Sequence, residues 1–318
     1  MNRAAVIIPN LNGIAYIRGC LDSLAEQSCR DFETVVIDNG SEDGSAQVIE
    51  EEYPWVKLKK LSRNTGFCHA VNLGIRMSDA PVVILLNNDT VCRPDFVREL
   101  LSGIERHPKA FSCCSSMRRL DKPDLLDDAG DYYCVLGWAF AAGKDREASL
   151  YAKERKVFAS CGGASAYRRD YLEKTGLFDE KHFAYLEDID IGYRARILGY
   201  ENWYIPSAQV LHAGSASSGS RYNRFKVLHT SRNSIYLIYK NMPLPQILLN
   251  FPFLLAGWLI KAVFFARRGY LREYMRGSAA GLSYCRREKK VKFERRNLIH
   301  YGTIQAELWL NLFRRFVS

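Results

Sequence analysis

The chain has 318 residues, enough for one large domain or for a catalytic domain with an appendage. Hydrophobic residues make up 47% and charged residues 25% of the sequence, which permits a substantial core and excludes disordered, collagen-like and coiled-coil chains. The net charge of +10 is unevenly placed, because residues 225–318 carry +13 and residues 1–224 carry −3. The basic character therefore belongs to the C-terminal region.

The nine cysteines are spaced without any C-x-x-C pair. This spacing predicts neither a zinc site nor a disulfide framework, and we expect most of the thiols to be free and buried. The first apolar run, Val6–Ile8, is far too short for the core of a signal peptide. We therefore expect the N-terminal region to stay in a reducing cytoplasm.

Short β-branched segments alternate with amphipathic segments through the first two hundred residues. The strand-like segments are Val6–Ile8, Thr34–Ile37, Val56–Leu61 and Val82–Leu86. This alternation predicts an α/β fold with a mostly parallel sheet and helices on both of its faces. Ligands of such sheets bind beyond the carboxyl ends of the strands, so we look for the site there.

Two segments depart from this pattern. Residues 120–156 are rich in Asp, Lys and Arg with few apolar periods, and we interpret them as an irregular excursion, a lid or an acceptor-side loop. After Ser220 the composition becomes aromatic, apolar and basic. We therefore predict two domains, 1–222 and 223–318.

Carboxylates follow two of the predicted strands. Asp38 ends the second strand, where it could accept the imide N–H of a pyrimidine base, or could cap the next helix together with Ser41. Asp89 closely follows the strand Val82–Leu86. A hard divalent cation takes one or two carboxylates together with substrate phosphates, although an Asp in this position can also simply form a turn.

Three acids, Glu187, Asp188 and Asp190, fall within four positions at the start of a predicted helix. The helix dipole favours acids in a first turn, yet one of the three could act as a general base, and spacing alone leaves the choice open. For Arg194 on the same helix we favour a salt bridge to these acids. His212 ends a further short strand, where a purely structural role is the alternative to ligand binding.

Taken together and in order, these segments resemble the inverting glycosyltransferases of family 2, and in particular their bacterial rhamnosyltransferase-like branch. The resemblance extends over about residues 4–216; no single motif is specific, but five in the same order are. The matching segments are Val6–Asn12, Val36–Ser45, Asn64–Phe67 with Asn72 and Gly74, Leu85–Thr90 and Gly176–His212.

The resemblance implies a GT-A fold that binds a nucleotide-diphosphate sugar and a divalent cation, Mg²⁺ or Mn²⁺. It implies that Asp188 is the catalytic base and that Asp89 and His212 hold the metal. We ourselves place Glu187 on the acceptor side, with Asp190 in a supporting role there. Asn87 stands where the strict family motif has its first Asp, which removes one charge from the metal site. The residues implied to bind the nucleotide sugar are Pro9, Asn12, Asp38, Asn64, Gly66, Asn87 and Asn88.

The implied reaction is a single displacement that transfers a sugar to a lipid-linked or growing cell-surface glycan. The branch resemblance suggests dTDP-rhamnose as donor, otherwise a UDP- or GDP-hexose. The alternative is a membrane-bound nucleotide-sugar-binding protein without turnover, and the presence of Asp188, Asp89 and His212 together argues against it.

The apolar stretch Ile247–Ala266 is long enough to span a bilayer and is followed by two arginines. A span would separate the basic tail from a cytoplasmic catalytic domain, against the positive-inside rule. We therefore expect a peripheral or monotopic protein on the anionic, cytoplasmic face of the cell membrane, with Trp258, Phe264 and Phe265 among the headgroups. A packed helical subdomain with a solvated basic face is the alternative. We expect no nucleic-acid partner, because an apolar stretch precedes the basic tail.

Overall fold

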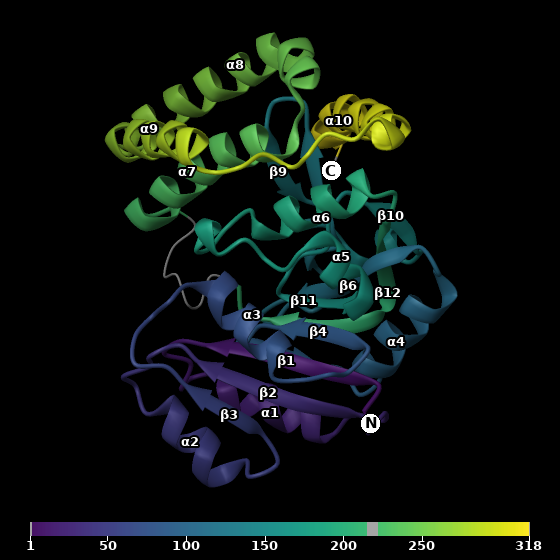
Figure 1. Ribbon diagram of the computed structural model, residues 1–318. Coiled ribbons are helices and arrows are strands. Elements are labelled where there is room, and N and C mark those ends of the chain that lie inside the picture. The colour runs from purple at the N-terminus through teal and green to yellow at the C-terminus, as the bar shows by residue number, and fades with distance from the viewer. Residues whose placement is uncertain (1, 215–221, 318) are drawn as a thin grey trace.

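A twisted, ten-stranded sheet forms the centre of the computed structural model, which describes residues 2–214 and 222–317 (Figure 1). Neighbouring strands follow the order β10-β12-β6-β11-β4-β1-β2-β3, with β5 paired to β12 and β7 paired to β6. The strands are β1 (Ala4–Asn10), β2 (Phe32–Asp38), β3 (Lys57–Lys60), β4 (Val82–Leu86), β5 (Thr90–Cys92), β6 (Ala110–Arg119), β7 (Leu126–Asp128), β10 (Arg155–Val157), β11 (Ala164–Arg168) and β12 (Glu201–His212).

The four strands expected from the sequence, β1 to β4, pair in parallel as predicted. β1 and β4 read as nearly continuous apolar runs because both of their faces are covered. Beyond β4 the antiparallel β11 leads to β6, with which β12 pairs in parallel. The α/β class and the mostly parallel sheet are therefore confirmed.

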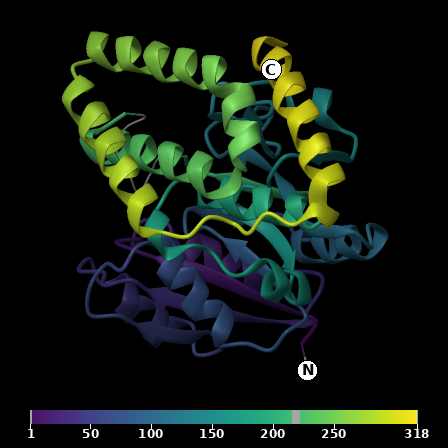
Figure 2. The same ribbon diagram turned by 45° about the horizontal axis from the view of Figure 1, so that its top comes forward.

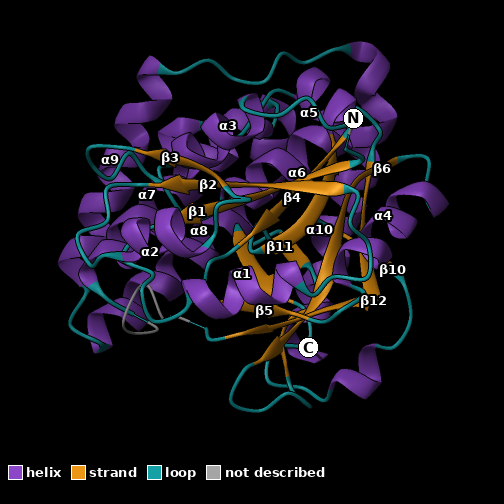
Figure 3. Ribbon diagram, turned by 90° about the horizontal axis from the view of Figure 1, so that it is seen from below, coloured by secondary structure: helices purple, strands orange, loops and turns teal. Residues whose placement is uncertain are grey.

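Helices cover both faces of this sheet (Figure 3). Val6 and Ile8 of β1 pack on one face with residues of α1, α2 and α4, whereas Ile7 packs on the other with residues of α3, α5 and α6. This alternation follows from the two-residue period of a strand. The helices are α1 (Ile17–Ala25), α2 (Ser45–Glu52), α3 (Phe67–Arg76), α4 (Phe96–Arg106), α5 (Arg169–Thr175) and α6 (Glu187–Ile197).

Residues 120–156 are more regular than we expected, and the interpretation of an irregular excursion is wrong. They contain β7, the start of β10 and a hairpin formed by β8 (Asp131–Cys134) and β9 (Trp138–Ala141). Gly137, with φ of +71°, lies in the hairpin turn, where a side chain would be strained. The buried Tyr133 joins a core cluster, which fixes the hairpin against the rest of the molecule.

The C-terminal helices gather at the end of the molecule away from β2, β3 and α2 (Figures 1 and 2). The predicted boundary near residue 222 adjoins residues 215–221, which lie outside the described part of the chain. The helices are α7 (Arg224–Asn241), α8 (Leu244–Arg267), α9 (Leu271–Arg287) and α10 (Leu298–Val317).

The predicted apolar stretch lies within α8, and this helix has its polar residues turned inward. Asn250 exchanges hydrogen bonds with Gln305 of α10, and Gly257 packs against Leu136. Phe265, which we expected among lipid headgroups, is instead 8% exposed and part of a buried cluster. The outward face is apolar, and its exposed residues are Leu244, Leu248, Leu249, Phe251, Phe253, Leu255, Leu259, Ile260 and Val263.

α8 is also the one helix among the described residues whose length and composition would allow it to cross a membrane. An apolar outer face combined with a polar inner face is the reverse of the soluble pattern. Large exposed apolar surfaces mark sites of interaction with proteins or membranes. All nine cysteines are free, as the sequence predicted.

Candidate active site

The carboxyl ends of β1, β2 and β4 are joined through the side chain of Asn10. Its Nδ2 donates to Oδ1 of Asp38 at 2.8 Å, and its Oδ1 accepts from Nδ2 of Asn88 at 2.7 Å. Asn10 is fully buried, and Gly13 approaches it so closely that a Cβ there would lie 2.3 Å from its Oδ1. The second oxygen of Asp38 accepts from the backbone N–H of Ser41, so this carboxylate also holds the turn that enters α2.

The loop before α3 is fastened beside Asp38 by Asn39. Asn39 donates to Oδ1 of Asn64 at 3.1 Å and to the carbonyl oxygen of Gly66 at 3.3 Å. Its own Oδ1 accepts from the backbone N–H of Thr65. The structure thus brings two residues predicted to bind the nucleotide sugar next to the predicted base-reading carboxylate, through a residue that the sequence did not single out.

Asn12 and Pro9 complete this edge. Asn12 has a φ of +50°, and its side-chain oxygen accepts from the backbone N–H of Glu42, so its predicted contact with a nucleotide competes with a turn-forming role. Pro9 is half-buried in β1 opposite Ile37. Both residues lie near the end of β1, where a ligand of the sheet would bind.

The predicted metal residues lie side by side. β12 pairs with β5, which brings Nε2 of His212 to 3.2 Å from Oδ1 of Asp89. Nδ1 of His212 is 2.7 Å from Oδ2 of Asp127, which also pairs with Lys144. Burial opposes a charge on His212, but the hydrogen bonds to both carboxylates raise its pKa to about 9. Asp127 was not expected at this site, although it lies in the acid-rich segment.

This donor set fits a divalent cation. Asp127 fixes the imidazole through Nδ1 and leaves Nε2 turned toward the buried carboxylate of Asp89, the arrangement that orients metal-binding histidines. One carboxylate and one imidazole would leave further positions for water and substrate phosphates.

Asn87 and Asn88, predicted as a pair of donor contacts, have different surroundings. Asn88 is 7% exposed and its amide is committed to Asn10. Asn87 is half-buried and lies beside Gly163, where a Cβ would come within 3.0 Å of its Nδ2. Asn87 is therefore the more accessible of the two to a bound nucleotide sugar.

The turn before α6 is conformationally strained. Phe183, Tyr185 and Leu186 have φ values of +61°, +73° and +66°, each of which costs about 1–3 kcal/mol for a residue other than glycine. Asn233 of α7 supports the turn, because its Nδ2 donates to the carbonyl oxygens of His182, Ala184 and Tyr185 at 2.7–3.0 Å. Such strain is typical of functional sites.

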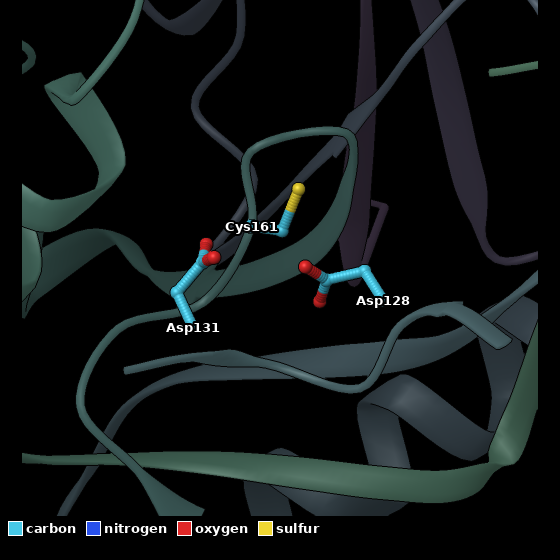
Figure 4. Close-up of side chains that lie close together, drawn as sticks. All are labelled: Asp128, Asp131 and Cys161. Carbon is cyan, nitrogen blue, oxygen red and sulfur yellow. The ribbon is translucent and has the colours of Figure 1, made fainter. Parts of the chain in front are cut away.

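Asp188 follows this turn and belongs to a group of acids from three segments. It is hydrogen-bonded to Asp131 at the start of β8 and accepts from the backbone N–H of Ile189 at 2.7 Å. Asp131 in turn lies with Asp128 and Cys161, with their polar atoms within 4.8 Å of one another (Figure 4). The acceptor-side role that we expected for residues 120–156 thus has carboxylates to support it.

These acids hold their protons more tightly than isolated carboxyl groups. Burial and the negative charges nearby raise the pKa of Asp131 well above its usual value and that of Asp128 to about 7. Burial also raises the pKa of Asp188, an effect opposed by its hydrogen bonds from Ile189 and Asp131. Because the pKa of Asp131 is raised so strongly, Asp131 is the protonated partner and donates a hydrogen bond to the carboxylate of Asp188.

Glu187, which we expected on the acceptor side, and Asp190, which we expected to support it, differ sharply in their surroundings. Burial and the charge of Asp188 raise the pKa of Glu187 to about 8, and its Oε2 has no hydrogen-bond partner. Asp190 is fully buried against Arg194 and Lys240, which hold its pKa well below the usual range despite burial.

Asp190 is thus a structural counter-charge with no surface to offer an acceptor, and the salt bridge expected for Arg194 is confirmed. Asp179, His182 and Asp190 could together hold a metal by proximity, but the Lys240 ammonium already lies within 2.6 Å of Asp179 and 2.8 Å of Asp190.

Three comparisons with known proteins agree with this geometry. The family model described as Glycosyl transferase family 2 matches residues 5–176. The chain is 31% identical over 244 residues to an N-acetylglucosaminyl-diphospho-decaprenol L-rhamnosyltransferase of Mycobacterium tuberculosis, covering 68% of this chain and 78% of that one.

Solved structures share the fold at low identity. A mannosyltransferase from Pyrobaculum calidifontis in complex with GDP-Man and Mn²⁺ matches with a TM-score of 0.56 and 17% identity, covering 96% of this chain and 84% of the other. GalNAc-T7 with UDP, GalNAc and Mn²⁺ matches with a TM-score of 0.59 and 16% identity over 75% of this chain and 48% of the other. The fold is the predicted GT-A fold, and the chain belongs to glycosyltransferase family 2.

Proposed function

We propose that this glycosyltransferase moves a sugar, with inversion, from a nucleotide diphosphate to a lipid-linked glycan at the cytoplasmic face of the cell membrane. The observation that carries the proposal is that Asp38 and the pair Asp89 and His212 lie at one edge of the sheet, close to the dyad Asp131 and Asp188. The link runs through Asp127, which bonds to His212, and Asp128, on which the charges of Asp127 and Asp188 both act. Asp38 can accept a hydrogen bond from a nucleobase, and Asp89 with His212 can hold a cation against a diphosphate. Asp188 can take the proton of a reacting hydroxyl.

Asp38 and the loop held by Asn39 would bind the nucleoside. A pyrimidine N3–H needs an acceptor, and Asp38 is an acceptor at the end of β2. We favour dTDP-rhamnose as donor because the mycobacterial relative is a rhamnosyltransferase, with a UDP- or GDP-hexose as the alternative.

Asp188 would act as the base. Its carboxylate takes the proton of an acceptor hydroxyl while that oxygen forms a bond to the anomeric carbon and the bond from that carbon to the diphosphate oxygen breaks. Attack from the face opposite the diphosphate inverts the configuration, and the nucleoside diphosphate leaves. The hydrogen bond from Asp131 favours the ionised form of Asp188 that this step requires.

Asp89 and His212 would hold Mg²⁺ or Mn²⁺, which would supply positive charge against the negative charge on the departing diphosphate. Asp127 keeps the His212 ring in place for this task. Solved structures of the same fold that contain Mn²⁺ together with a nucleotide or nucleotide sugar support a cation here.

The inverted polarity of α8 supports attachment to the membrane surface. Its apolar outer face would lie among the acyl chains, and the basic residues that follow, Arg267 and Arg268, would meet anionic headgroups. The acceptor named for the mycobacterial relative is a lipid diphosphate, which suits an enzyme at this surface.

The test uses the purified full-length chain in detergent with Mn²⁺ and, in separate samples, dTDP-rhamnose, a UDP-hexose and a GDP-hexose. Thermal unfolding identifies the donor, because a ligand that binds only the native state raises the melting temperature. Transfer is then measured to an N-acetylglucosaminyl-diphospho-polyprenol, and the anomeric configuration of the product is determined. Donor binding without transfer to any lipid-linked acceptor would favour the alternative, a binding protein without turnover.

A further inference from the structure

An apolar cavity of about 630 Å³ lies between α7, α8, α9 and the β8–β9 hairpin, apart from the residues assigned above. Its size falls in the range of about 300–1,000 Å³ typical of ligand pockets. Ile238 of α7, Leu254 of α8 and Leu282 of α9 are among its walls, and Trp138 and Trp258 lie at its sides. No acidic residue lines it among the described parts of the chain.

A second cavity, of about 560 Å³, lies next to the first and reaches the strained turn at residues 183–186 before α6, which we call the catalytic turn. The two share Trp138, Ser234 and Lys261 in their linings. At its other end the second cavity is lined by Leu186, the residue two before Asp188. The two cavities therefore share a wall, and the path defined by their linings runs from the outer apolar helices to the turn before the proposed base.

Positive charge gathers along the second cavity. Lys144, Lys261 and Arg315 line it, together with one acid, Asp145. Lys144 is paired with Asp127 and Asp145 with Arg119, which leaves Lys261 and Arg315 as the cations without a carboxylate partner among the described residues. Lys261 lies at the junction of the two cavities, with its Nζ 5.6 Å from the ring centroid of Trp138. Among the described residues it has no carboxylate within salt-bridge distance, so its charge is available to an anionic ligand.

We propose that this path binds the lipid diphosphate of an isoprenoid-linked acceptor. The isoprenoid chain lies in the apolar cavity, the diphosphate meets Lys261 where the cavities join, and the attached sugar extends past Leu186 toward Asp188. From the outer helices inward, the path is first apolar, then cationic at Lys261, and then reaches the catalytic turn. An isoprenoid-linked acceptor has its chain, its diphosphate and its sugar in the same order. This proposal rests on the proposed function and deepens it by naming where the acceptor binds.

An ordinary membrane phospholipid matches this order less well. Its phosphate belongs at the bilayer surface beyond the acyl chains, whereas Lys261 lies between the apolar cavity and the cavity that is lined by Leu186. In an isoprenoid diphosphate the phosphates stand between the chain and the reacting sugar. The cations occupy that intermediate position.

The experiment measures binding of farnesyl diphosphate, farnesol and short-chain phosphatidylglycerol to the full-length protein in detergent. The change in intrinsic tryptophan fluorescence reports occupancy, because two of the five tryptophans, Trp138 and Trp258, line the apolar cavity. Ala279→Phe places an aromatic ring in the cavity from an exposed position on α9, and Ser283→Phe is its control on an exposed position outside both cavities. Lys261→Gln removes the junction charge, and Arg276→Gln removes an exposed charge on α9 outside both cavities.

We expect saturable binding of farnesyl diphosphate that Ala279→Phe weakens at least tenfold and Ser283→Phe leaves unchanged. Lys261→Gln should weaken binding of farnesyl diphosphate at least tenfold but binding of farnesol less than twofold, with Arg276→Gln near wild type for both. The proposal is overturned if farnesyl diphosphate does not bind saturably, if Ala279→Phe binds it as wild type does, or if Lys261→Gln affects both probes equally. Displacement of farnesyl diphosphate by equimolar phosphatidylglycerol would also overturn it, in favour of a bulk-lipid site.

A failure of this proposal can be distinguished from a failure of the proposed function. Binding of farnesyl diphosphate requires neither a donor nor turnover, and melting-temperature shifts with the nucleotide sugar are recorded for every variant. Normal donor shifts with no isoprenoid binding would reject the acceptor path alone. Isoprenoid binding without any donor shift would reject the proposed donor chemistry and leave the path standing.

Discussion

The Nζ atom of Lys240 in α7 lies 2.8 Å from Oδ2 of Asp190 in α6, and both side chains are buried. α7, the first helix after the predicted domain boundary, thus supplies a counter-charge to α6, whose first turn contains the proposed base. Asn241 adds a hydrogen bond to the other oxygen of Asp190 at 2.8 Å. The predicted boundary at residue 222 marks a change in composition. These contacts nevertheless join α7, which lies beyond the boundary, to α6, which follows the catalytic turn.

Lys240→Met should lower the free energy of unfolding by about 3 kcal/mol, because removal of one partner leaves a buried carboxylate short of positive charge. Urea denaturation followed by circular dichroism measures this. Lys289→Met, at an exposed position, is the control and should stay within about 0.5 kcal/mol of wild type. A Lys240 variant as stable as the control would show that Arg194 alone neutralises Asp190.

Asn233→Asp should reduce kcat strongly, since the carboxylate has the same size but cannot donate to the three carbonyl groups of the strained turn. We expect at least a tenfold loss in kcat and a smaller loss in donor affinity, because the turn directly precedes the proposed base and meets the proposed nucleoside site through the packing of Phe183 on Gly66. Steady-state kinetics and donor melting shifts distinguish the two effects. Equal losses of donor binding and kcat would instead indicate a general loss of folding.

Asp188→Asn should abolish transfer and preserve donor binding, because the amide keeps the shape of the side chain but cannot take a proton. Radiolabelled sugar transfer measures the first property and thermal shift the second. If turnover stays within about tenfold of wild type, a barrier change of about 1.4 kcal/mol, the base must be sought at Glu187.

Asp131→Leu should shift the acidic limb of the pH profile of kcat/KM to higher pH. The base must be ionised, so the rate falls as pH drops below the pKa of Asp188, and loss of the hydrogen bond from Asp131 raises that pKa further. A lost bond to a charged group corresponds to a shift of about one to two pH units. Asp131→Asn keeps a donor and should shift the limb less; identical profiles for both variants would argue against the dyad.

Asp89→Ala and His212→Ala should each weaken Mn²⁺-dependent donor binding by at least about tenfold, or about 1.4 kcal/mol. Asp127→Asn should have a smaller effect, because it disturbs the orientation of the imidazole and leaves both proposed ligands in place. Titration of Mn²⁺ with the donor present gives the apparent metal affinity. Unchanged metal dependence in both alanine variants would remove the proposed site.

The sequence alone predicted those features of the fold that are determined by residues close together in the chain. The strands β1 to β4 have local apolar patterns, and polar residues at their ends necessarily meet at one edge of a parallel sheet. Asp38 and Asp89 could therefore be placed without coordinates.

Contacts between distant segments could not be predicted in the same way. Asp127 meets His212 across 85 residues, and Lys240 meets Asp190 across 50, and neither pair shares a local pattern. The hairpin that carries Asp131 was missed because its aromatic residues showed no clear alternation. A hint was present in the acids of residues 120–156, whose number exceeded what a solvated loop requires.

The apolar outer face of α8 has a geometrical consequence. Exposed apolar side chains also occur on α9 and α10, among them Leu271 and Ile299. These helices lie with α8 at one end of the molecule (Figure 2). A protein resting on a bilayer through three helices has a fixed tilt, because three supports define a plane. The catalytic turn then stands at a constant height above the lipid.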